Sequence, residues 1–150
     1  MTSDDIKSMN LEEVKSVCKS LNLPSYRASQ IFSWLQKEGV SDYDEMTNIP
    51  KSLRQTLSEN YPIRSCEIEL KRVSKTDGTV KYLFKLYDGN FIESVLMKYK
   101  YGYTLCISSQ VGCKMGCAFC ASTLNGCVRS LSSGEMLSEV LLANRYLGEK

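Results

Sequence analysis

The chain has 150 residues, of which 43% are hydrophobic and 24% are charged, a composition typical of a folded domain and not of a disordered segment. Its formal net charge is only +2, so the total charge does not indicate nucleic-acid binding. The first thirteen residues contain four acidic side chains and no continuous apolar run, so we expect neither a secretory signal nor a membrane span. We therefore expect a cytoplasmic, monomeric protein with no membrane partner.

Residues 1–63 are expected to form a small helical domain. Apolar residues recur there at helical spacing, Asn10 is a suitable N-cap for the first helix, and Gly39 is placed to end the second. The spacing predicts three helices, over about residues 11–21, 28–35 and 50–57.

From Arg64 onwards the period of the apolar residues changes to two, which is typical of strands. Asp-Gly pairs at positions 77 and 88 supply the turns between them. Residues 64–100 are therefore expected to form an antiparallel β extension of three strands, over Cys66–Leu70, Val80–Leu86 and Ile92–Leu96.

The last third of the chain, residues 101–150, predicts a strand, a cysteine-rich loop and a helix. The strand covers about residues 103–108, and Ser132 with Glu135 forms a capping box at the start of the helix. Strand, loop and helix make the first βα unit of a parallel fold, so we predict the α/β class, with an incomplete barrel that begins at residue 101. The helix is expected to bury an apolar face made of Leu137, Val140, Leu141 and Leu147.

Seven cysteines in a protein expected to be cytosolic favour metal or redox chemistry over a disulfide framework. Cys113, Cys117 and Cys120 form a Cys-x3-Cys-x2-Cys pattern, and thiolates are the ligands that iron–sulfur clusters prefer. Three thiolates on a four-iron cluster leave one iron open, where the amino and carboxylate groups of a small molecule can bind. The pattern therefore predicts a catalytic 4Fe-4S site.

These cysteines have two other interpretations. The spacing i, i+4, i+7 also fits the buried face of a helix, but Gly112 and Gly116 disfavour a helix interior. Cys106 or Cys127 would complete a four-thiolate zinc site of a nucleic-acid-binding ribbon, although such ribbons usually carry two Cys-x2-Cys pairs and only one occurs here. A helical adaptor with no metal is a third, non-catalytic alternative.

The run from Cys106 to Cys120, continuing to Gly126 and Arg129, closely resembles the RlmN/Cfr family of radical S-adenosylmethionine (SAM) RNA adenine methyltransferases, and the RlmN branch fits best. Segments outside the run resemble the family's helical accessory domain and its β extension, so that the likeness spans nearly the whole chain: Tyr26–Leu35, Asp77–Thr79 and Ile92–Val95. The resemblance implies that residues 101–150 begin a radical SAM barrel of partial TIM type, which stops at the end of this chain.

The resemblance also implies cofactor positions. Cys113, Cys117 and Cys120 match the three cluster ligands, and Phe119 matches an aromatic beside bound SAM, although core packing explains Phe119 equally well from sequence alone. Cys127 is a departure from the family pattern and is interpreted as an incidental thiol.

Two catalytic residues are implied in the same way. Cys106 matches a cysteine that forms a transient disulfide with a methyl-carrying cysteine near the far C-terminus, which releases the methylated RNA. Glu93 matches a glutamate assigned as proton acceptor. Without the resemblance, Cys106 is interpreted as a strand-end thiol and Glu93 as a solvated strand residue.

In the family, a deoxyadenosyl radical takes hydrogen from the methyl group on the C-terminal cysteine, and the resulting carbon radical adds to adenine C2. The substrates are large-subunit (23S) ribosomal RNA and certain transfer RNAs, and an external, flavodoxin-like protein donates the electron. The resemblance does not separate C2 methylation from the C8 methylation of the Cfr branch. The methyl-carrying cysteine would lie beyond Lys150, so we expect a fragment that is inactive alone.

Basic and aromatic residues are interleaved in the middle of the chain. Residues 64–103 carry 8 basic and 5 acidic side chains, together with Tyr82, Tyr87, Tyr99, Tyr101 and Tyr103. Such a surface either contacts RNA through phosphates and stacked bases or is a solvated face of the sheet, and the sequence favours neither.

Overall fold

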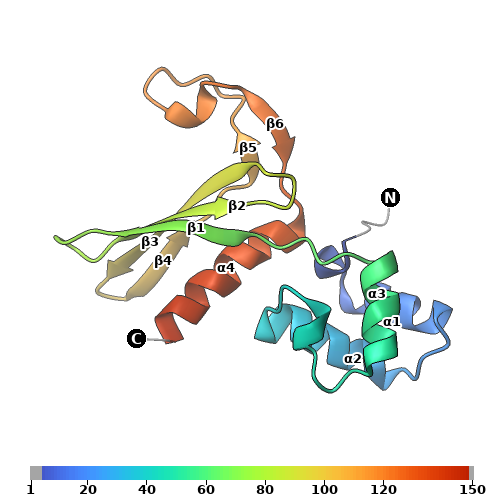
Figure 1. Ribbon diagram of the computed structural model, residues 1–150. Coiled ribbons are helices and arrows are strands. Elements are labelled where there is room, and N and C mark those ends of the chain that lie inside the picture. Colours follow the sequence, from blue (N-terminus) through green and yellow to red (C-terminus); the bar gives the residue numbers. More distant parts are fainter. Residues whose placement is uncertain (1–4, 149–150) are drawn as a thin grey trace. The chain divides into compact units, whose positions relative to one another are not determined.

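A computed structural model describes residues 5–148 and divides the chain into two compact units, Met1–Ser65 and Cys66–Lys150 (Figure 1). The second unit contains both the expected β extension and the residues expected to begin a barrel. Within the described part, no helix is long and apolar enough to cross a membrane.

The first unit is helical, and its three predicted helices are confirmed as α1, α2 and α3. Asn10 and Glu13 form the capping box of α1, with reciprocal hydrogen bonds of 2.7 and 3.0 Å. Gly39 has a φ of 66° and ends the turn that extends the second helix, as expected for a left-handed C-terminal cap. The unit comprises η1 (Ile6–Ser8), α1 (Leu11–Ser20), α2 (Tyr26–Ser33), η2 (Trp34–Glu38), η3 (Tyr43–Glu45) and α3 (Lys51–Asn60).

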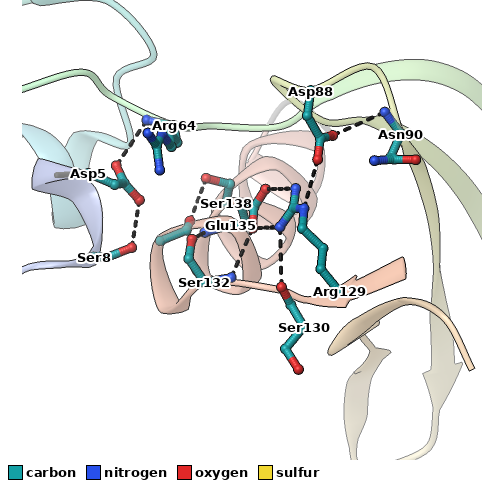
Figure 2. A network of polar contacts seen from close by, with 11 residues as sticks. Asp5, Ser8, Arg64, Asp88, Asn90, Arg129, Ser130, Ser132, Glu135 and Ser138 are labelled. Carbon is teal, nitrogen blue, oxygen red and sulfur yellow. Dashed lines mark hydrogen bonds and ion pairs between the residues drawn. The ribbon is translucent and has the colours of Figure 1, made fainter. Parts of the chain in front are cut away.

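The two ends of the first unit are held together by one buried carboxylate. Asp5 accepts hydrogen bonds from the backbone N–H of Arg64 at 2.9 Å and from the hydroxyl of Ser8 (Figure 2). It also accepts one from the backbone N–H of Lys7 at 3.1 Å. These bonds join the first turn of the chain to the segment that leaves the unit. The apolar core beneath them is drawn from all three helices, including Val14, Ile31 and Leu57.

The second unit is built on an antiparallel sheet in the order β1-β2-β3-β4, with β1 spanning Glu67–Val73, β2 Val80–Lys85, β3 Phe91–Tyr99 and β4 Gly102–Cys106. The predicted three-stranded meander is confirmed. The strand expected to begin a parallel unit, β4, instead pairs antiparallel with β3, because a hairpin at Lys100–Tyr101 is too short for a parallel crossover. The barrel itself stays a prediction.

Helix α4 (Ser133–Gly148) covers one face of this sheet, packing with Tyr82, Phe84 and Leu96 (Figure 1). Its predicted capping box is confirmed, since Ser132 N–H donates to Glu135 at 2.8 Å and Glu135 N–H donates to the Ser132 hydroxyl at 3.2 Å. The predicted apolar face is wrong except for Leu147, which packs on the core: the fully buried residues are Gly134, Glu135, Ser138, Glu139 and Ala143, and Leu137, Val140 and Leu141 are only half-buried.

The cysteine-rich segment contains two further strands that the sequence analysis did not predict. β5 (Gln110–Gly112) and β6 (Cys127–Ser130) pair antiparallel and form the stem of a loop, which also carries the short helix η4 (Ala121–Thr123). Strands of three and four residues are too short for an alternating pattern to be recognised.

Candidate functional site

The stem of the cysteine loop is closed by a glycine that no other residue can replace without displacement. Gly112 has a φ of 74°, and a Cβ placed there would lie 2.0 Å from the carbonyl oxygen of Gly126. The next residue, Cys113, donates its backbone N–H to the same carbonyl at 3.0 Å. The glycine therefore allows the two sides of the stem to approach just where the first predicted cluster ligand begins.

The three predicted ligands follow one another around this loop. Cys113, Cys117 and Cys120 are half-buried free thiols, and Met115 donates its backbone N–H to the sulfur of Cys113 at 3.5 Å. The Cys120 N–H donates to the Cys117 carbonyl at 3.1 Å, so the last two ligands share a tight turn. Over residues 5–148, no three His, Cys, Asp or Glu side chains are close enough to hold a metal ion.

The donor set nevertheless fits an iron–sulfur cluster. Three accessible, unpaired thiols lie on a segment with positive-φ glycines, and at least one backbone amide is already directed at a sulfur. Ligands of a metal site are commonly drawn together only when the metal binds, because binding and folding are coupled. The assignment of the three ligands stays a prediction.

A cavity of about 750 Å³ brings several of the predicted residues together. Its wall is formed by β3, the segment between β4 and β5, and both sides of the cysteine loop. Four of the six predicted site residues line it: Glu93, Cys106, Cys113 and Cys120. Cys117 is not part of the wall, and Phe119 is 93% exposed on the loop, so the structure does not bring these two into the cavity.

Glu93 and Cys106 lie on the same face of the sheet. Cys106 is the register partner of Val95, and Val95 follows Glu93 by two residues, so all three side chains point away from the face covered by α4. The carboxylate of Glu93 forms a 2.7 Å ion pair with Lys81, in which both side chains are about half exposed. The thiol of Cys106 is exposed at the end of β4, where a partner can reach it.

Arg129, on β6, anchors the stem of the loop to the rest of the unit (Figure 2). Its guanidinium donates to both carboxylate oxygens of Glu135, at 2.8 and 2.9 Å, and to Asp88 at 2.7 Å, and it lies 5.2 Å from the ring centroid of Tyr87. Asp88 belongs to the β2–β3 turn and Glu135 to the first turn of α4. A single side chain thus connects loop, sheet and helix.

These contacts alter the acidity of the groups involved. The hydrogen bond from Arg129 lowers the pKa of Asp88 to about 2, and bonds to the two carboxylates raise the pKa of Arg129. Burial alone would raise the pKa of Glu135, but hydrogen bonds from Arg129 and Ser132 outweigh it, so its pKa is lowered. The three groups therefore remain charged around neutral pH.

Two residues behind the site are not indicated by sequence patterns. Arg129 stands in the sequence only as the end of a motif, and nothing there marks Glu139, whose side chain is fully buried against Ser94 and Ser108. A capping box signals Glu135, but no local pattern shows that an arginine six residues earlier reaches it, or that a glutamate inside a helix is buried.

Comparison with known proteins identifies close relatives. Residues 5–63 match the family described as the ribosomal RNA large subunit methyltransferase N-terminal domain. The whole chain is 51% identical to 42% of a "Probable dual-specificity RNA methyltransferase RlmN" of Alkaliphilus metalliredigens, and 97% of it is 52% identical to 41% of the protein of the same name from Lachnoclostridium phytofermentans. The chain thus spans about two fifths of the length of these relatives.

A solved structure is also similar. The crystal structure of a radical SAM methyltransferase from Sphaerobacter thermophilus matches 97% of this chain, and 42% of its own, with a TM-score of 0.85 and 40% identity. Fold and sequence together show that the chain is similar to a radical SAM methyltransferase. More narrowly, residues 5–63 match the N-terminal domain of the ribosomal RNA large subunit methyltransferases, and the whole chain is similar to about two fifths of the relatives named RlmN.

Proposed function

We propose that this protein takes part in radical SAM methylation of adenine C2 in large-subunit ribosomal RNA and certain transfer RNAs. The observation that carries the proposal is the cavity lined by Glu93, Cys106, Cys113 and Cys120, in a chain whose relatives are named dual-specificity RNA methyltransferases. The parts of the reaction that depend on residues beyond Lys150 belong to the longer proteins that this chain partly matches.

The cysteine loop is the part that would bind the cofactors. Cys113, Cys117 and Cys120 would ligate a 4Fe-4S cluster, which when bound supplies the electron that cleaves SAM. Phe119 would lie beside SAM; its exposed ring on the same loop is available for such a contact. Gly112 and the Arg129 contacts hold the base of the loop, so that ligand binding needs to order only residues 113–126.

Glu93 would accept a proton in the reaction, and Cys106 would take part in the thiol exchange. Glu93 accepts the proton that leaves adenine C2, and the ion pair with Lys81 orients its carboxylate until the substrate enters. Cys106 forms the transient disulfide with the methyl-carrying cysteine, a step that requires an accessible thiol such as this one. Both side chains lie on the same sheet face and line the cavity.

The remaining assignments follow from the family and belong to the proposal. A flavodoxin-like protein would donate the electron, the substrates would be ribosomal and transfer RNA with the target base unstacked, and the protein would act in the cytoplasm. Chain 1–150 alone is expected to bind the cluster but not to turn over.

Anaerobic reconstitution tests the cluster. Chain 1–150 is incubated with iron and sulfide, and we expect about four irons and four acid-labile sulfides per chain. Alanine at Cys113, Cys117 or Cys120 should abolish incorporation, whereas Cys127→Ala is the matched control and should retain it. One zinc per chain after iron and sulfide were offered would instead favour the zinc-ribbon alternative, and neither metal would favour an adaptor.

The reaction is tested in cells with the complete gene. Mass analysis of ribosomal and transfer RNA from a deletion strain, complemented with wild type, Glu93→Gln or Cys106→Ala, should show 2-methyladenine only with the wild type. Cys127→Ala should restore the modification fully. An 8-methyladenine product would assign the chain to the Cfr-type reaction.

A further inference from the structure

Glu139 is a fully buried carboxyl group in the middle of α4. Its Oε2 accepts hydrogen bonds from the hydroxyl of Ser94 on β3 and from the backbone N–H of Ser108, the latter at 3.0 Å. Its Oε1 is buried as well and has no hydrogen-bond partner among the described residues. A buried helix position would ordinarily be apolar, so this carboxyl group requires an explanation.

The two partners of Glu139 belong to the wall of the candidate site. Ser94 follows Glu93, the proposed proton acceptor, and Ser108 lies two residues beyond Cys106. The hydroxyl of Ser108 also donates to the backbone carbonyl of Glu93 at 2.7 Å, and Glu93, Cys106 and Ser108 all line the cavity. Glu139 thus bonds, from the helix side of the sheet, to both segments that carry the proposed catalytic residues.

The surroundings of Glu139 favour its neutral form. Burial raises its pKa, the nearby negative charge of Glu135 adds to this effect, and the hydrogen bonds from Ser94 and Ser108 compensate only in part. The guanidinium of Arg129 is committed to Glu135 and Asp88, so it does not ion-pair with Glu139. An ionised Glu139 would leave one charged oxygen buried without a partner, which is costly.

We propose that Glu139 is a positioning residue that holds β3 at Ser94 and the cavity wall at Ser108 against α4, and that it does so as a neutral carboxylic acid. The proposal rests on the function proposed above only in taking the cavity as the catalytic site. The contacts that support it are independent of the cluster, SAM and RNA.

The neutral state has a consequence for stability. A carboxyl group whose pKa is higher in the folded than in the unfolded chain stabilises the fold fully below the unfolded value, about 4.3 for Glu, and this contribution is lost as the pH rises towards the folded value. In that window the equilibrium constant for opening rises by up to about tenfold per pH unit. Replacement with Gln removes the titration but keeps a neutral hydrogen-bonding group of the same shape.

Hydrogen exchange followed by mass spectrometry tests this in chain 1–150, with wild type, Glu139→Gln and Glu139→Ala compared at the same pH. Peptides that cover β3, residues 106–109 and α4 are the readout, and peptides from α1–α3 are the control. At about pH 5 the wild type and Glu139→Gln should exchange within about twofold of each other. As the pH is raised to about 8 the wild type should exchange increasingly faster than Glu139→Gln, and Glu139→Ala should exchange faster than both.

The proposal is overturned if Glu139→Gln exchanges faster than the wild type at every pH or fails to fold, since an ionised carboxylate would then be needed. It is also overturned if the ratio between wild type and Glu139→Gln does not depend on pH, or if Glu139→Ala exchanges no faster than Glu139→Gln. None of these results concerns cluster binding or RNA methylation. A failure of the proposed function therefore leaves this test unaffected, and the reverse also holds.

Discussion

At the scale of single residues, Arg129 is the side chain that connects β6, the β2–β3 turn and α4 through ion pairs. Its partner Glu135 is fully buried, so removing the cation takes two hydrogen bonds and the compensating charge away from a buried carboxylate. Arg129→Met should lower the free energy of unfolding of the second unit by about 3–5 kcal/mol, the usual cost of breaking a buried pair from one side. Urea unfolding, monitored by hydrogen exchange of α4 peptides, measures this loss of unfolding free energy.

A matched set of variants separates charge from shape. Arg129→Lys keeps the charge but not the two parallel bonds to Glu135. Its free energy of unfolding should therefore lie between those of the wild type and Arg129→Met. The double variant Arg129→Met with Glu135→Gln should recover part of the loss, because it no longer buries an unpaired charge. Fluorescence of Trp34, the single tryptophan, reports the first unit in the same experiment. If Arg129→Met had the same free energy of unfolding as the wild type, the contact between Arg129 and Glu135 would not have the stabilising role given to it.

The pKa of Asp88 makes a separate prediction about acid stability. Its folded value of about 2 lies below the ordinary value of about 3.9, so its ion pair with Arg129 stabilises the fold above about pH 4 and is lost as the pH falls towards 2. The difference in unfolding free energy between wild type and Asp88→Asn should therefore shrink as the pH is lowered from about 5 to about 2.5. A difference that stays constant over this range would argue against the ion pair.

At the scale of elements, sequence patterns located what depends on local spacing. The three helices of the first unit, the strands β1 to β3 and the capping box of α4 each follow from periodicity, Asp-Gly turns or an N-cap. The buried face of α4 could not be predicted, because Glu139 is buried against Ser94 and Ser108, which are far away in the sequence, and Glu135 is paired with an arginine outside the helix. The antiparallel pairing of β4, in contrast, follows from its short connection to β3, since a parallel pair needs a crossover of a dozen or more residues.

The stem of the cysteine loop offers a test at this scale. Gly112→Ala should open the β5–β6 stem and reduce iron incorporation, because a methyl group there would lie 2.0 Å from the Gly126 carbonyl and the backbone has positive φ. Gly116→Ala is the matched control: its φ of 66° is also positive but the space around it is empty, so only about 1 kcal/mol of backbone strain is expected. Equal iron content in both variants would refute the importance of the close approach.

At the scale of the whole molecule, the sequence predicts only those residues of the candidate site that belong to a recognisable motif. Glu93, Cys106, Cys113 and Cys120 are predicted from the sequence, and the fold gathers them around one cavity because β3, β4 and the loop are neighbours. Cys117 and Phe119 are not in that wall. Their roles depend on bound cofactors and stay predictions.

RNA binding is the last prediction, and it concerns the hairpin between β3 and β4. Tyr99 and Tyr101 stack with their centroids 5.2 Å apart, Tyr101 is 80% exposed, and Lys98 lies 5.9 Å from the ring centroid of Tyr103. Exposed rings beside cations suit stacking with unpaired bases and contact with phosphates. Tyr101→Ala should therefore weaken binding of single-stranded RNA by about tenfold, a loss within the range of one stacked base.

The control for this prediction is Tyr101→Phe, which keeps the ring and should bind like the wild type. Fluorescence anisotropy of a labelled single-stranded RNA at two salt concentrations measures both variants, and replacing Lys98 with Ala should reduce the dependence of affinity on salt, because one phosphate contact is lost. If Tyr101→Ala, Tyr101→Phe and the wild type bind equally, the hairpin is a solvated surface and does not contact RNA.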